Sequence, residues 1–366
     1  MIFGYYGHGN IGDEANLRLL IRELRQIEPA LPITVISANP AQTAFRHRVQ
    51  ACGRLELWSW LAPFRRSEWL IGGGGSLFQD HSSLRSLLYY AGLTVLAKIC
   101  GMKVLLYGQG IGPFETRIGK KLAGLALNRA DLIVLRDRLS LAALSALGVT
   151  RPELHWTAEP LLVTEPVPKP QIIHYWEPYS ADRRFRIGVA IRRDRAASFQ
   201  DWAGLVQLLK SQNDVSVYLL ITEPADLQLA EIVAVATETV LLPPAEEWEE
   251  LQTAVGGLDL LVSARLHGLV AAAVQGVPGF GLSCDPKIEG FCLQMNLPFR
   301  RIRSAADWDI MPQRILGKLY HSDEKGSPGL GPEVSCWRAR AAENRMLLEK
   351  VIESKRDAYP YTGHSG

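Results

Sequence analysis

The sequence opens with MIFGYYGHGNIGDEA (residues 1–15), in which an apolar run leads through a glycine-rich turn into an amphipathic segment. The run Met1–Tyr6 predicts a buried strand, and the pattern from Glu14 to Ile27 predicts a helix. A glycine-rich turn between a strand and a helix is typical of βα units that bind an anion at the helix amino terminus. This stretch therefore indicates an α/β protein built on parallel strands.

The same alternation continues along the chain and is interrupted once. In the first half, further strands are predicted at residues 33–38, 69–71, 103–107 and 132–135, and helices at 84–100, 117–130 and 139–147. After the interruption, strands are predicted at 185–191, 215–221, 240–242, 258–263 and 279–282, and helices at 199–211, 225–235, 246–256, 267–275, 309–319 and 335–354. Strands alternating with helices in two series favour two domains, each with a parallel sheet.

The interruption is TEPVPKPQIIHYWEPYSAD (residues 164–182), which has four prolines and little periodicity. We interpret it as a linker with one short strand at residues 172–175. It separates a first domain, 1–163, from a second, 183–323, and the helix at 335–354 is expected to pack back on the first. The prediction is thus two Rossmann-like doubly wound domains facing a cleft. We also predict a Gly- and Pro-rich loop at residues 324–332, before the last helix, and a disordered end at residues 361–366.

Composition excludes several classes of protein. The 366 residues are 47% hydrophobic and 21% charged, which is the balance of a packed protein. Lys and Arg total 40 against 38 Asp and Glu, so no overall field exists to hold nucleic acid. The early acids Asp13 and Glu14 fit no signal peptide, and the five cysteines contain no CxxC pair. We therefore expect a cytoplasmic protein without a metal site.

Three glycine-rich segments follow predicted strands. In the first, Gly9 and Asn10 lie in a turn that matches a dinucleotide fingerprint only loosely, because Ser37-Ala-Asn-Pro stands where an acidic residue is expected. The alternative is a tight βα turn whose helix is capped by Asn10 or Asp13. In IGGGGSLFQD (residues 71–80), Gly73 and Gly74 favour close approach of a ligand or of the facing domain over a purely structural turn. The third segment, around Gln109, is either such a site or a sharp turn before a helix.

The segment SARLHG (residues 263–268) carries the strongest chemical pattern. If the strand at 258–263 continues, Arg265 and His267 lie on one face of its carboxyl end, and Lys287 follows the next strand. Arginine suits bidentate recognition of a carboxylate or phosphate, lysine binds phosphate as a point charge, and histidine can donate a proton near neutral pH. Arg136, after the strand at 132–135, is expected to point toward the cleft. An anion site is therefore favoured over a histidine that only packs in the core.

In order along the chain, GYYGHGNIGDEA, IGGGGSLFQD, YGQGIGPF, LRDRLS and SARLHGLVAAAVQGVP resemble a polysaccharide pyruvyl transferase of the CsaB type. The resemblance runs from about Ile2 to about Leu319. It implies a fold similar to GT-B glycosyltransferases and transfer of pyruvate from phosphoenolpyruvate onto two sugar hydroxyls as a cyclic ketal. The acceptor in such enzymes is typically an N-acetylmannosamine residue of a lipid-linked cell-wall polymer precursor. No cofactor is implied beyond the donor substrate.

The resemblance also implies roles for individual residues. Arg265 and His267 would bind phosphoenolpyruvate, with Arg136 and Lys287 as partners. The chemistry of the reaction, taken by itself, requires a general acid and a base, for which His267 and either Asp13 or Glu14 are the candidates. Gly9, Asn10, Gly73, Gly74 and Gln109 would form backbone turns on the acceptor side. The sequence departs from the pattern at Thr157-Ala-Glu-Pro160, where an Asp is expected in place of Glu159, and at Arg192-Arg-Asp194, where an aromatic residue is common.

Two other functions stay open at this point. The same two-domain fold serves glycosyltransferases that use a nucleotide sugar, although no acidic residue is clearly placed to bind a ribose. A noncatalytic protein that binds sugars or anions is the second alternative. The expected partners are phosphoenolpyruvate and a sugar or lipid-linked saccharide, without nucleic acid. A lipid-linked acceptor leaves peripheral membrane contact open.

Overall fold

The computed structural model describes residues 1–81, 83–179, 184–194, 197–302, 306–309, 311–323 and 332–358. The chain divides into two compact units. The first unit contains Met1–His8, Asp13–Val163 and Arg338–Gly366, and the second contains Gly9–Gly12 and Thr164–Trp337. The chain therefore leaves the first unit after Val163 and returns to it at Arg338. The predicted loop at 324–332 and end at 361–366 lie almost entirely outside the described residues.

The first unit is built on a parallel sheet in the order β3-β2-β1-β4-β6-β7-β8, with β5 paired to β6. Its strands are β1 (Ile2–Phe3), β2 (Thr34–Ser37), β3 (Gln50–Gly53), β4 (Trp69–Gly72), β5 (Gly75–Phe78), β6 (Lys103–Ile111), β7 (Leu132–Leu135) and β8 (Glu153–Trp156). Its helices are α1 (Ile11–Ile27), α2 (Pro40–His47), α3 (Leu57–Arg66), α4 (Leu84–Ile99), α5 (Arg117–Leu127), α6 (Arg138–Ala146) and α15 (Pro332–Ala358). A 3-10 turn, Pro160–Val163, ends its middle segment.

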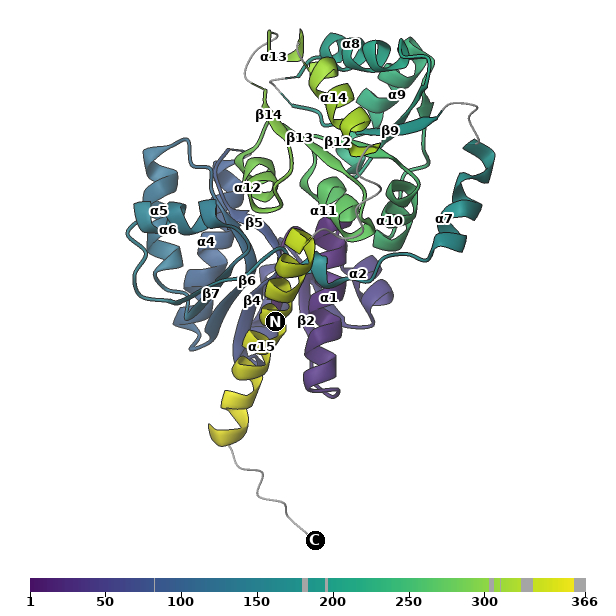
Figure 1. Cartoon of the computed structure of the whole chain (residues 1–366). Helices are drawn as coiled ribbons and strands as arrows, with labels where there is room; N and C mark the ends of the chain where they lie inside the picture. Colours follow the sequence, from purple (N-terminus) through teal and green to yellow (C-terminus); the bar gives the residue numbers. More distant parts are fainter. Residues whose placement is uncertain are drawn as a thin grey trace. The chain divides into compact units, whose positions relative to one another are not determined.

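Two apolar cores lie on this sheet. One contains side chains of α1 and α15, and the other contains side chains of α3, α4, α5 and α6. Helix α15, yellow in Figure 1, contributes Leu347, Leu348, Val351 and Ile352 at helical spacing to the core that it shares with α1. The last helix thus completes the unit in which the chain began.

The second unit has a parallel sheet in the order β11-β10-β9-β12-β13-β14. Its strands are β9 (Phe185–Ala190), β10 (Val215–Leu220), β11 (Val240–Leu241), β12 (Leu260–Ser263), β13 (Gly279–Ser283) and β14 (Phe299–Arg301). Its helices are α7 (Lys169–Trp176), α8 (Phe199–Lys210), α9 (Leu227–Thr237), α10 (Trp248–Gly256), α11 (Leu266–Gln275), α12 (Pro286–Gln294), α13 (Ala306–Asp309) and α14 (Met311–Asp323). Because the strand order reverses between β9 and β12, the crevice at their carboxyl ends is where such sheets bind ligands.

The α/β class with two Rossmann-like sheets is confirmed. The short strand predicted at residues 172–175 is wrong, since these residues belong to α7. Trp176 at the end of α7 is buried and packs edge-on against Tyr218 of β10, so tertiary packing orders a segment that has no clear periodicity. No described helix is long and apolar enough to cross a membrane.

Candidate functional site

Arg265 lies in the second unit, between the end of β12 and the start of α11, where it is the N-cap residue. Its Nε and Nη2 each donate to Asp226, at 2.8 Å to Oδ2 and Oδ1, and Nη1 pairs with Glu223. Burial alone would lower the pKa of Arg265, but these two carboxylates and that of Asp285 raise it. The planar fork predicted to clamp a ligand is therefore oriented by Asp226, which is itself fully buried.

His267 does not lie on an extended strand end. Strand β12 stops at Ser263 and α11 begins at Leu266, so His267 is in the first turn of a helix. The prediction that strand alternation puts Arg265 and His267 on one face is therefore wrong in its geometry. The segment Gly9–Gly12 groups with this unit, and a Cβ on Gly12 would lie 1.8 Å from Nδ1 of His267. Only glycine at position 12 leaves room for this ring where it stands.

Lys287 lies in the first turn of α12, after the neighbouring strand β13. The N-cap residue of α12 is Asp285, whose carboxylate accepts from the backbone N–H of Lys287 at 3.1 Å. The same carboxylate lies 3.3 Å from both Lys287 Nζ and Arg192 Nη1. Although burial opposes ionisation, these two cations hold the pKa of Asp285 well below its usual range. The cations at this edge of the sheet are thus held by carboxylates.

The ends of β12 and β13 can bind an anion even though carboxylates balance the nearby cations. Helices α11 and α12 follow adjacent parallel strands, so their amino termini lie at the same edge of the sheet. Helix amino termini favour anions through backbone N–H groups and the helix dipole. An arginine has five N–H donors, and three on Arg265 engage Asp226 and Glu223. The other two N–H donors of the fork take no part in these three contacts.

Asp226 and Glu223 were not found from the sequence. Both follow β10, and they lie about forty residues from Arg265 along the chain. The segment Thr222-Glu-Pro-Ala-Asp226 has the polar, proline-containing character of a strand end, which is a weak indication. Asp226 also accepts from the backbone N–H of Arg193 at 2.8 Å, so it joins the loops after β9, β10 and β12.

The two candidate bases lie in the first turn of α1, in the first unit. Glu14 accepts from the backbone N–H of Gly7 at 2.7 Å and lies 3.7 Å from Nε2 of His47. Asp13 is buried, and a Cβ on Gly75 would lie 2.9 Å from its Oδ1. Asn10 lies just before α1 and accepts from the N–H of Gly12 at 3.2 Å. Glu14 therefore stabilises the glycine turn whatever other role it has.

Arg136 is buried at the carboxyl end of β7. Its Nη1 lies 2.8 Å from Oε2 of Glu159, and its Nη2 donates to Ser76 at 2.9 Å. Glu159 also accepts from Asn16 of α1 at 3.1 Å. The residue that departs from the family pattern, Glu159, thus links α1, β7 and the segment after β8.

The close approach at the glycine run is made by side chains of the first unit. A Cβ on Gly73 would lie 1.8 Å from the hydroxyl of Tyr6, and one on Gly74 would lie 2.8 Å from Asn16. Gln109 donates to the carbonyl of Gly73, with further contacts to Gly72 and Tyr107. Packing of α1 and its preceding loop is therefore sufficient to require glycine at positions 73 and 74. A role of this turn in acceptor binding stays a prediction.

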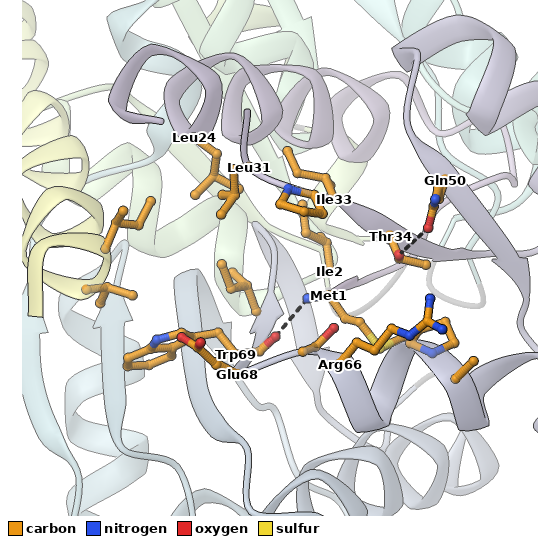
Figure 2. A pocket seen from close by; sticks show the side chains of 17 residues that line it. Met1, Ile2, Leu24, Leu31, Ile33, Thr34, Gln50, Arg66, Glu68 and Trp69 are labelled. Carbon is orange, nitrogen blue, oxygen red and sulfur yellow. Dashed lines mark hydrogen bonds between the residues drawn. The ribbon is translucent and has the colours of Figure 1, made fainter. Parts of the chain in front are cut away.

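A cavity of about 430 Å³ lies elsewhere in the first unit. Its lining includes Met1, Ile2 and Trp69 at the amino ends of the strands, with Val351 and Ile352 of α15. Figure 2 shows its apolar side chains and the hydrogen bond from the Met1 nitrogen to the Trp69 carbonyl, 2.7 Å long. Ligands of doubly wound sheets bind at the carboxyl ends of the strands, so we do not assign this cavity to the reaction. Among the described residues, no group of three or more His, Cys, Asp or Glu could hold a metal ion.

Several solved structures share the fold over nearly the whole chain. Anabaena Alr3699/HepE in complex with UDP and glucose has a TM-score of 0.64 at 10% identity, covering 97% of this chain and 100% of that chain. Staphylococcus aureus MnaA with UDP has a TM-score of 0.64 at 11% identity, covering 99% and 97%. The spinosyn rhamnosyltransferase SpnG has 0.57 at 12% identity, covering 96% and 100%. At these identities the likeness shows the fold alone, and the fold is that of GT-B glycosyltransferases and sugar epimerases.

The sequence defines the protein family more narrowly than the fold does. The family model for polysaccharide pyruvyl transferases matches residues 10–286, which include SARLHG, the two later glycine-rich segments and the end of the first. No curated protein matches the chain. The chain belongs to the polysaccharide pyruvyl transferase family, and it is a transferase that acts in polysaccharide pyruvylation.

Proposed function

We propose that this protein is of the CsaB type and transfers pyruvate from phosphoenolpyruvate onto two hydroxyls of one sugar, as a cyclic ketal. The acceptor would be a cell-wall polysaccharide or its lipid-linked precursor. Family membership supports the pyruvyl transfer. The observation that carries the donor assignment is the pair of adjacent helix amino termini, α11 and α12, which bear Arg265, His267 and Lys287.

Phosphoenolpyruvate has a carboxylate and a phosphate joined through one carbon centre, so its site needs two anion-binding groups a few ångströms apart. Two helix amino termini at one edge of a sheet supply such a pair. The two remaining N–H donors of Arg265 would bind one anionic group in a fixed plane. Lys287, balanced against Asp285, would attract the other. Arg136 belongs to the first unit and remains a candidate partner there.

The proposed reaction balances without an oxidant or a cofactor. His267 donates a proton to the methylene carbon of phosphoenolpyruvate, which becomes the methyl group of the ketal. The first sugar hydroxyl attacks the neighbouring carbon and passes its proton to a base, for which Asp13 and Glu14 are the candidates. The second hydroxyl then forms a bond to the same carbon as the bond to phosphate breaks, and its proton leaves with inorganic phosphate. The products are the pyruvylated sugar and phosphate.

The sequence differences between this chain and the family pattern bear on the acceptor more than on the donor. Glu159 replaces an expected Asp, and the longer side chain is fully engaged with Asn16 and Arg136. An extra methylene at a buried site shifts whatever hydrogen bonds the shorter acid would make. We therefore propose that the acceptor differs from the N-acetylmannosamine typical of the type, or is bound in a different orientation.

The test is incubation of the enzyme with phosphoenolpyruvate and a panel of saccharides, including lipid-linked ones. We expect a product heavier by one pyruvate less one water, with one phosphate released per product. Thermal-shift measurements with phosphoenolpyruvate and with UDP, GDP and CMP sugars discriminate the alternative. Stabilisation by a nucleotide sugar, together with glycosyl transfer and no response to phosphoenolpyruvate, would replace this proposal with a glycosyltransferase.

A further inference from the structure

Helices α3, α4, α5 and α6 cover one face of the first unit's sheet and share one apolar core. Helices α4 and α5 pack against each other and lie close together in Figure 1. None of the four helices contains an Asp or Glu. Their Lys and Arg residues are Arg65, Arg66, Arg85, Lys98, Arg117, Lys120, Lys121 and Arg138. Because the whole chain has nearly equal numbers of acidic and basic residues, this face is an exception.

The same helices expose apolar side chains to solvent. On α4, Leu88, Leu96 and Ile99 form a stripe opposite the buried side, and Ile99 is 77% exposed. On α5, which packs against α4, Ile118 and Leu125 are 62% and 59% exposed. Trp58 at the start of α3 is 87% exposed. Helix α4 is therefore apolar on both its inner and its outer side.

On the outer surface of this face, exposed Lys and Arg residues outnumber the acidic residues that could pair with them. Lys98 is paired with Asp131 at 2.8 Å, so its charge is balanced. Glu115 pairs with His81, and the exposed acids Glu56 and Glu68 lie before and after α3. Asp80 and Asp137 are buried and accept hydrogen bonds from backbone N–H groups. The exposed cations of α4 and α5 are matched by no acid on either helix; they are Arg85, Arg117, Lys120 and Lys121.

We propose that this face, formed by the outer sides of α3, α4 and α5, docks on the surface of an anionic lipid bilayer. Exposed Trp, Leu and Ile among Lys and Arg are what an interfacial surface needs, because the apolar groups enter the headgroup region and the cations attract anionic lipids. A second copy of this chain would bring two cationic faces together and is disfavoured. The outer apolar residues of α8 and α9, by contrast, accompany Asp201 and Glu231.

Gly92 makes a sharp test, since it lies between Leu88 and Leu96 on the exposed stripe of α4. A Cβ there meets nothing within 4 Å, so a side chain can be added without a clash. Wild-type protein should co-sediment with vesicles of equal parts phosphatidylcholine and phosphatidylglycerol, and less with phosphatidylcholine alone. Gly92→Glu should weaken binding about fivefold or more, because it adds one negative charge at the surface. Gly92→Gln, of the same shape, should bind as the wild type does.

Two controls keep the result interpretable. Gly204→Glu, at a glycine of α8 with open space around it, changes net charge equally and should leave vesicle binding unchanged. The Gly92→Glu and Gly92→Gln variants should have the same melting temperature, at or above that of the wild type, because glycine is unfavourable inside a helix. Circular dichroism should show the same fold for all variants. Equal binding of Gly92→Glu and Gly92→Gln would overturn the proposal, as would failure of the wild type to bind anionic vesicles at low salt. A dimer that Gly92→Glu dissociates would make the face a self-association surface instead. No donor or acceptor is present, so the result is independent of the proposed reaction.

Discussion

Asp285 holds two cations and caps a helix with one carboxylate, and its contribution to stability should depend on pH. The pKa of Asp285 is lower in the folded protein than in the unfolded chain. Its ionised carboxylate therefore stabilises the fold at any pH above the unfolded-state pKa, and this stabilisation is lost as the pH falls toward the folded-state pKa. Asp285→Asn keeps a capping oxygen but loses the attraction to Lys287 and Arg192. We expect it to lower the free energy of unfolding by about 2 kcal/mol at pH 7.

Urea denaturation of both proteins at several pH values checks this expectation. The difference between wild type and variant should shrink below the pH at which an ordinary aspartate protonates, near 4. A difference that stays constant down to pH 3 would show that the cap geometry, and not the charge, is what matters.

His267 is predicted to act as the general acid of the proposed reaction. Glutamine at this position can still donate a hydrogen bond but cannot titrate near neutral pH. His267→Gln should therefore keep the KM for phosphoenolpyruvate within a few-fold and lower kcat on the order of a hundredfold. The variant's pH profile should also lose its alkaline limb, because a general acid acts only while it is protonated. Normal turnover by this variant would leave Asp13, Glu14 or a water as the proton source.

Gly73→Ala should destabilise the first unit, because the added methyl would collide with the Tyr6 hydroxyl. We expect a loss of about 1–3 kcal/mol, the range for overpacking a core. Tyr6→Phe removes that hydroxyl, which is buried and has no hydrogen-bond partner among the described residues. The double variant should recover much of the loss in thermal unfolding. If Gly73→Ala melts like the wild type but loses activity, ligand approach at this turn is favoured instead.

At the residue scale, the sequence singles out Arg265 as a candidate ligand-binding residue but does not reveal Asp226 and Glu223, which orient it. Asp226 and Glu223 reach Arg265 because the loops after β10 and β12 converge at one edge of the sheet. That convergence depends on strand order, which local patterns do not contain. The geometry predicted for His267 is wrong because it extends the strand past Ser263, whereas helix α11 begins at Leu266.

At the scale of elements, α15 stabilises the first unit through a few buried side chains. Leu348 is fully buried, whereas Met346, two residues away, is 60% exposed. Leu348→Ala should cost about 2–5 kcal/mol, and Met346→Ala should cost little. Chemical denaturation of the two variants gives the comparison. Similar losses for both would mean that α15 is not packed as described.

Long periodic elements were predicted well, and short ones were missed. Strands β3 and β8 lie at the edges of the first sheet and contain polar residues such as Gln50 and Glu153, so they lack a continuous apolar run. Strand β5 starts at Gly75, which has a φ of +133° and is the last residue of a glycine run that resembles a loop. Helix α12 begins with Pro286, which breaks a helix in its interior but is favourable in its first turn.

At the scale of the whole molecule, the two units differ in how the chain forms them. Residues 164–337 contain all of the second sheet and its core. We expect this fragment to unfold cooperatively when expressed alone. Residues 1–163 lack α15, so they expose the apolar core that it covers and should aggregate. Circular dichroism melting and gel filtration distinguish the two. A soluble, cooperative 1–163 fragment would contradict the role given to α15.

The return of the chain to its first unit has a consequence for biosynthesis. On the ribosome, the face of the first sheet that receives α15 stays uncovered while the entire second unit is translated, which takes on the order of ten seconds. During that interval, Leu17, Leu20 and Ile2 belong to an unfinished core that nascent-chain chaperones can bind. The second unit can fold as soon as it emerges, so the amino-terminal half of the protein is made first and finished last.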